Sequence, residues 1–123
     1  ASDLSAGAEE VDGIMVIARR TEVEDVPALR AMADGLREKM ESGVGVLGAQ
    51  FDGKGSFIAV VTDDLIKGRG LKAGDIVRSV AQLTGGSGGG KPHLAQAGVR
   101  DLEKIDEALA AVAGIVSEQL GKG

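Results

Sequence analysis

The sequence predicts a mixed α/β domain, in which a small mixed β-sheet carries helices packed on it. Short apolar runs alternate with longer stretches of helical spacing, an Asp-Gly turn signal separates two of the runs, and the elements follow the order β-α-β-β-α-α. The chain has 123 residues, the length of one domain. Hydrophobic residues make up 43% of it, which predicts a folded core built almost entirely from aliphatic side chains, since Phe51 and Phe57 are its only aromatic residues.

The apolar runs place three strands. The first is expected at residues 11–20, where Ile14–Ile17 form a continuous run that indicates burial on both faces of a sheet. Two further strands are expected at residues 44–51 and 56–62. Between them stands Asp52-Gly53-Lys54-Gly55, and Asp-Gly accepts the positive φ angles of a tight hairpin turn.

Helical spacing places three helices. The first is expected to begin at Asp25 as N-cap, with Pro27 in its first turn, and to end at Ser42-Gly43. The second is expected at residues 72–83, and the last from Asp101, its N-cap, to Leu120. Apolar residues recur at helical spacing along the first and last helices: Val26, Leu29, Met32, Ala33, Leu36 and Met40, then Leu102, Ile105, Leu109, Val112, Val116 and Leu120.

The domain is expected to occupy residues 11–120. Residues 1–10 lack periodicity and are interpreted as a tail or the end of a linker from a longer protein, and residues 121–123 as a second tail. No apolar run approaches the ~20 residues that cross a membrane, and the acidic start does not resemble a signal peptide. Because cysteine is absent, disulfides and thiolate zinc sites are excluded. We expect a cytoplasmic protein, with no membrane partner and no cofactor in this domain.

The glycine-rich segment at residues 85–98 is the main functional signal. Glycine lets the backbone approach a ligand closely, and successive N–H groups in such a loop can form a concavity for an anion such as phosphate. Lys91 and His93 follow the glycines and would add side-chain donors. A mobile surface loop between the last two helices is the alternative. The fixed order of polar residues after the glycines favours a binding loop.

Charge is segregated along the chain. The net charge is −5, which by itself argues against a nucleic-acid partner. Residues 67–91, however, carry five basic residues against one acid, Asp75, whereas residues 1–25 carry seven acids against two arginines. A basic segment that leads into the glycines predicts a face that follows phosphates. An ordinary solvated surface is the alternative.

No catalytic centre is visible in the sequence. Asp63, Asp64 and Asp75 suggest helix capping more than acid–base chemistry, and His93 has no orienting carboxylate at a recognisable spacing. The glycines follow a predicted helix, so they match neither a P-loop nor a dinucleotide fingerprint. We therefore expect that this chain alone is not an enzyme.

The glycines open a motif that carries a family resemblance. Gly88-Gly89-Gly90-Lys91-Pro92-His93-Leu94-Ala95-Gln96-Ala97-Gly98 resembles the loop of the C-terminal domain (DHHA1 type, or C-Ala) of bacterial alanyl-tRNA synthetase. Residues 72–77, 25–40 and 46–63 fall in the family's order, so that the resemblance covers residues 11–120. The chain departs from the family in three places. It has His93 where an acid is usual, Lys91 where Arg is usual, and Val99 where a further glycine is frequent.

The resemblance implies a function. Domains of this family recognise the corner of tRNA where the D- and T-loops meet, are joined to aminoacylation and editing domains, and in some members help to form a homodimer. The parent protein would be an alanine–tRNA ligase, and the RNA an alanine-specific tRNA. Contacts to phosphates and 2′-hydroxyls would suit shape-based RNA recognition. The residues expected to contact RNA are Lys67, Arg69, Lys72, Arg78, Gly88, Gly89, Gly90, Lys91, His93 and Gln96.

Two other functions remain open at this point. One is the substrate-holding domain of a DHH-type nucleic-acid phosphoesterase, a related group that usually has His directly after the glycines, where this chain has Lys91-Pro92. The other is a plain homo-oligomerisation domain that uses the stripe of the last helix.

Overall fold

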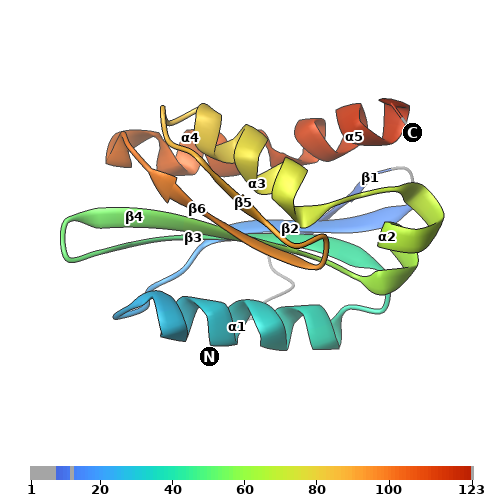
Figure 1. Ribbon diagram of the computed structural model, residues 1–123, viewed down its shortest axis with the longest axis horizontal. Helices are drawn as coiled ribbons and strands as arrows, with labels where there is room; N and C mark the ends of the chain where they lie inside the picture. The colour runs from blue at the N-terminus through green and yellow to red at the C-terminus, as the bar shows by residue number, and fades with distance from the viewer. Residues whose placement is uncertain (1–7, 12, 123) are drawn as a thin grey trace.

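The computed structural model describes residues 8–11 and 13–122, which form a six-stranded sheet with helices on both faces (Figure 1). The strand order is β1-β2-β3-β4-β6-β5. Strands β2 and β3 are parallel, and each of the other neighbouring pairs is antiparallel. The predicted mixed α/β class is confirmed.

The described elements have the following bounds. The strands are β1 (Ala8–Val11), β2 (Ile14–Arg20), β3 (Gly43–Phe51), β4 (Lys54–Val61), β5 (Gly88–Gly90) and β6 (Leu94–Val99). The helices are α1 (Val26–Lys39), α2 (Asp63–Arg69), α3 (Ala73–Gln82), the 3₁₀ turn η1 (Leu102–Lys104), α4 (Ile105–Ala110) and α5 (Val112–Lys122). No helix in this described part of the chain is long and apolar enough to cross a membrane.

The first predicted strand is in fact a hairpin. Val11 of β1 pairs with Ile14 of β2, and Gly13 in the connection has a φ of +80°. Residues 8–10, interpreted as part of a tail, therefore pair within the sheet, whereas the rest of that tail, residues 1–7, lies outside the described residues. The Asp-Gly dipeptide at residues 12–13 is the same turn signal as the one at residues 52–53.

Helix α1 begins as predicted. The Asp25 carboxylate accepts a hydrogen bond from the Ala28 N–H at 2.9 Å, and Pro27 stands in the first turn. The predicted end at Ser42-Gly43 is wrong, because the helix ends at Lys39 and Gly43 opens β3. The hairpin between β3 and β4 is confirmed, with positive φ angles at its two central residues, 50° and 72°.

Two hydrophobic cores lie on opposite faces of the sheet. Helix α1 covers one face, and α3, α4 and α5 cover the other (Figure 1). Val16 belongs to the core under α3–α5, and Ile17 belongs to the core under α1, so the run at residues 14–17 is buried on both faces as predicted. Phe57 belongs to the core under α3–α5, and Ile58, its neighbour on β4, belongs to the core under α1. Both side chains are fully buried.

The glycine segment does not form the predicted loop between the last two helices. Residues 88–90 and 94–99 are the antiparallel strands β5 and β6, and β6 also pairs with β4. Small residues make this packing feasible, because α3 lies so close to β5 that a Cβ at Gly74 would stand 3.0 Å from the carbonyl oxygen of Gly90. Ala95 and Ala97 of β6 are buried in the core beneath the same helix.

The predicted last helix is divided into three parts. Asp101 is the N-cap as expected, but of η1, and its carboxylate accepts a hydrogen bond from the Glu103 N–H at 3.1 Å. Helix α4 then ends at Ala110, and the N–H of Ala111 donates to the Ala108 carbonyl at 3.1 Å. No proline or glycine marks this turn in the sequence. Helix α5 continues to Lys122, so residues 121 and 122 of the predicted tail are helical.

Candidate nucleic-acid interface

Strand β5 forms one edge of the sheet and consists of three glycines. On its inner side, the Lys91 N–H donates to the Leu94 carbonyl and the Gly98 N–H donates to the Ser87 carbonyl, each at 3.0 Å. Because bonding alternates along an antiparallel strand, the peptide groups of Gly88 and Gly90 turn away from β6. Both residues are exposed. The predicted concavity of successive N–H groups is therefore wrong. The N–H and C=O of Gly88 point outward from the edge of the sheet, and those of Gly90 lie beside Gly74 of α3.

Glycine is required at one of these positions and optional at another. A Cβ at Gly88 would collide with the Cα of Ala97 on β6. A Cβ at Gly89 would have open space, with only the Arg78 Nη2 atom near it, at 3.5 Å. Arg78 projects from α3, so its guanidinium reaches the edge of the sheet beside the glycine strand.

A surface hollow of about 350 Å³ lies between the glycine hairpin and α1. It brings together five of the residues predicted to contact RNA: Gly89, Gly90, Lys91, His93 and Gln96. Lys91 is exposed, whereas the side chains of His93 and Gln96 are half-buried. Gln96 is the cross-strand partner of Gly89, so its amide faces a strand position that has no side chain. These residues thus bring an exposed cation, two hydrogen-bonding side chains and backbone without side chains to the hollow.

Two residues that line this hollow were missed in the sequence. Arg30 and Asp34 come from α1, which is far from the glycines in sequence. They are four residues apart and so lie on the same side of the helix. Each directly follows a buried residue, Leu29 or Ala33, so both lie at the border of the apolar face of α1. This position is the sequence signal that could have identified them. Only the pairing of β6 with β4, over which α1 packs, brings them to the glycine hairpin.

The other predicted contact residues lie outside the hollow. Lys72 is the N-cap of α3, directly before Ala73, whose N–H donates to the Pro92 carbonyl at 2.8 Å, so it stands near the tip of the hairpin. Arg78 is exposed and lies 3.7 Å from the carboxylate of Asp75, a weak pair of two exposed side chains. Lys67 and Arg69 are exposed on α2 and do not line the hollow.

None of the three acids considered in the sequence is the N-cap residue of its helix, because Thr62 is the N-cap of α2 and Lys72 that of α3. Asp63 pairs with Arg37 at 2.6 Å. Asp64 accepts hydrogen bonds from the hydroxyls of Ser42 and Thr62, each at 2.6 Å, and these bonds hold the pKa of Asp64 below its ordinary value. Within residues 8–11 and 13–122, no group of three or more His, Asp or Glu side chains could hold a metal ion.

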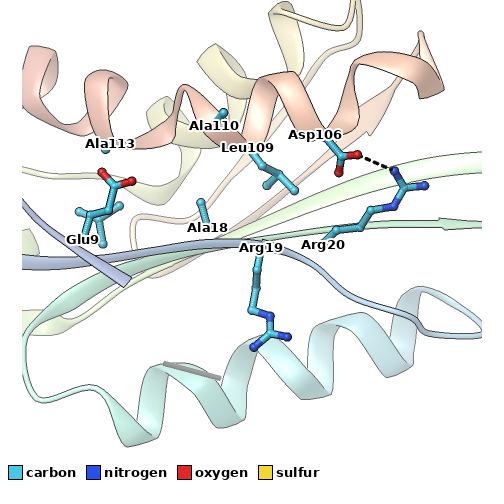
Figure 2. Close-up of a pocket in the computed structure, with 9 residues that line it drawn as sticks. Glu9, Ala18, Arg19, Arg20, Asp106, Leu109, Ala110 and Ala113 are labelled. Atoms are coloured by element: carbon cyan, nitrogen blue, oxygen red, sulfur yellow. Dashed lines mark hydrogen bonds and ion pairs between the residues drawn. The ribbon is translucent and has the colours of Figure 1, made fainter. Parts of the chain in front are cut away.

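A second hollow, of about 280 Å³, lies between β2 and the helices α4 and α5 (Figure 2). Its apolar walls include Ala18, Leu109 and Ala113, and the carboxylate of Glu9 lies at one end. At the other end, Arg20 contacts Asp106 at 3.5 Å, and it also donates to the Gln50 amide oxygen at 3.0 Å. Because the charge of Arg20 is already engaged, this hollow suits an anion less well than the glycine hollow does.

Comparison with known proteins finds relatives that share one name, alanine–tRNA ligase. The chain is 42% identical over 118 residues to an alanine–tRNA ligase of Acetivibrio thermocellus and 44% identical over 118 residues to one of a Roseiflexus species. Each match covers 96% of this chain and 13% of the relative, so the chain spans about one eighth of their length. The C-Ala domain of Aquifex aeolicus alanyl-tRNA synthetase has a similar structure, with a TM-score of 0.74 and 27% identity over 89% of this chain and 97% of that one.

A second solved structure shares the fold alone. It is a DHH-domain protein described as a member of a family of ribosomal proteins, with a TM-score of 0.56 and 17% identity over 94% of this chain and 29% of that one. The family match is direct, since residues 13–118 correspond to the DHHA1 domain. This chain belongs to the DHHA1 domain family.

Proposed function

We propose that the chain is a non-catalytic tRNA-binding and assembly domain of an alanyl-tRNA synthetase. The support is the agreement between its relatives, which are named alanine–tRNA ligases, and the chemistry of the glycine hollow. A domain that spans 13% of such a ligase leaves the remaining length for the aminoacylation and editing domains. Those domains would be its partners within the same chain, and the cytoplasm its location.

The glycine hollow carries the proposal. Gly89, Gly90, Lys91, His93 and Gln96 line one surface together with an arginine of α1. The N–H and C=O of Gly88 turn away from β6 at the exposed edge of the sheet, beside this surface, and add a backbone donor and acceptor that no side chain covers. Lysine and arginine would hold phosphates while Gln96 and His93 donate to sugar hydroxyls, which is the contact pattern of shape-based RNA recognition.

The proposed target is the outer corner of an alanine-specific tRNA, where the D- and T-loops meet. A folded corner presents a fixed arrangement of phosphates and 2′-hydroxyls, so a rigid hairpin can recognise it without a helix that reads base edges. A homodimer of the parent enzyme would be compatible with this role, because the hollow lies on one chain.

A binding titration tests the proposal. The 123-residue chain is titrated against a fluorescent alanine-tRNA transcript, and against a minihelix that has the acceptor stem but neither the D-loop nor the T-loop. We expect saturable binding to the full transcript that weakens as salt is raised, and clearly weaker binding to the minihelix. Equal affinity for the two RNAs would reject recognition of the corner, and absence of binding to both would reject the tRNA-binding function.

A further inference from the structure

Asp34 is an acid in a hollow that otherwise offers cations and hydrogen-bond donors. It lines the glycine hollow with Arg30, Lys91, His93 and Gln96. A carboxylate repels phosphate, so a surface that only followed the RNA backbone would gain affinity by losing it. Asp34 is exposed, and no contact of its carboxylate within the described residues gives it a role in the fold.

The neighbouring arginine does not neutralise this carboxylate. Arg30 and Asp34 have the i, i+4 spacing at which ion pairs form on a helix, yet no ion pair joins them within the described chain. Both charges are therefore available to a ligand that lies between α1 and the hairpin. A ligand that carries an anionic group and a hydrogen-bond donor close together, as a nucleotide does, would satisfy both.

We propose that Asp34 is a specificity-determining residue that accepts a hydrogen bond from a donor of the bound RNA, while Arg30 and Lys91 hold the phosphate. This inference rests on the proposed tRNA-binding function. The donor is a ribose 2′-hydroxyl, which RNA carries and DNA lacks, and a carboxylate is an acceptor matched to it. The carboxylate then favours RNA that presents the donor and repels strands that present phosphate alone.

The experiment compares Asp34→Asn with a matched variant, Glu38→Gln. Both changes remove one exposed negative charge from α1, but Glu38 does not line the hollow. Affinities are measured for an alanine-tRNA transcript and for an all-DNA strand of the same sequence. We expect the preference of Asp34→Asn for RNA over DNA to fall roughly tenfold, because the amide oxygen still accepts a hydrogen bond but without the negative charge, and that of Glu38→Gln to stay unchanged.

Two modified transcripts identify the donor. One carries deoxyribose in the D- and T-loops, and the other carries inosine in place of guanosine at their unpaired positions, which removes an amino donor. The wild-type chain should lose affinity for the deoxyribose transcript and keep its affinity for the inosine transcript, and Asp34→Asn should lose less than the wild type when deoxyribose is introduced. A wild-type loss confined to the inosine transcript would overturn the 2′-hydroxyl as the donor. If the wild type binds the transcript and Asp34→Asn keeps its full preference for RNA, the role of Asp34 is overturned while tRNA binding stands. If the wild type binds no transcript, the proposed function itself fails.

Discussion

The guanidinium of Arg78 lies beside Gly89, with its Nη2 atom 3.5 Å from the position that a Cβ of residue 89 would occupy. The two residues come from different elements, since Arg78 is on α3 and Gly89 is on the edge strand β5. A cation and a stretch of backbone without side chains thus stand next to each other at the edge of the sheet. This arrangement determines which substitutions at the glycines test binding and which ones test folding.

Gly89→Asp should weaken tRNA binding strongly and leave the fold intact. The site has room for a side chain, but the new carboxylate would repel phosphate and would pair with Arg78, so that two favourable contacts are lost together. Gly89→Ala is the control, because it adds bulk without charge. Fluorescence titration with tRNA at low and moderate salt measures both variants. Wild-type affinity and an unchanged salt slope in Gly89→Asp would place the RNA site elsewhere.

Gly88→Ala should destabilise the fold, because its Cβ would collide with the backbone of Ala97. Forcing an extra methyl group into a packed position costs about 1–3 kcal/mol. The free energy of unfolding in urea is the measurement, and Gly89→Ala, in open space, should stay within about 0.5 kcal/mol of the wild type. Equal stability of the two variants would mean that β5 moves aside to admit a side chain.

Removal of single cations from the hollow should flatten the dependence of tRNA affinity on salt. Arg30→Ala and Lys91→Ala each take away roughly one phosphate contact, so each should lower the slope of log K against log salt by about 0.7–0.9. Lys54→Ala, at the exposed start of β4 and outside the hollow, is the control and should leave the slope unchanged. Equal slopes for all three variants would show that the hollow holds no phosphate.

Leu109→Ala should cost about 2–5 kcal/mol of unfolding free energy, because its side chain is buried in the core under α4 and α5. Since Leu109 also borders the second hollow, we expect a value in the lower part of that range. Leu83→Ala is the matched control, because Leu83 is 43% exposed, against 6% for Leu109. This variant should lose only ~0.5 kcal/mol of unfolding free energy. Urea unfolding of both variants decides the matter, and a loss below roughly 0.5 kcal/mol for Leu109→Ala would contradict its burial.

Asp64 should make the stability of the domain sensitive to acid. Hydrogen bonds from Ser42 and then Thr62 lower the pKa of this carboxylate in the folded chain, so the ionised form is the one that folding favours. Its contribution is complete above the unfolded value of 3.8 and is lost as the pH falls through the lower folded value. The urea midpoint of the wild type should therefore fall more than that of Asp64→Asn between about pH 5 and pH 2. Glu107→Gln, at an exposed carboxylate of α4, should follow the wild type.

The sequence predicted those parts of the fold that depend on local signals. Asp25, Pro27 and the Asp52-Gly53 turn act through their own backbone geometry, and each was confirmed. The glycine strand was missed because three glycines have no side-chain alternation, and only pairing with β6 makes them a strand. Arg30 and Asp34 were missed for a related reason. Their helix packs on the other face of the sheet, and no spacing along the chain reveals which segment faces it across a hollow.

The bare backbone of β5 has a consequence for mutagenesis. The outward groups at Gly88 are the peptide N–H and C=O, which every substitution other than proline preserves. Alanine scanning along this strand would therefore report only steric clashes of the added methyl groups, because every backbone donor remains. A genetic screen would then attribute a lost backbone hydrogen bond to steric effects. Replacement of a single peptide bond by an ester, which deletes one N–H and adds no atoms beyond the backbone, is the substitution that would expose the contribution of the main chain.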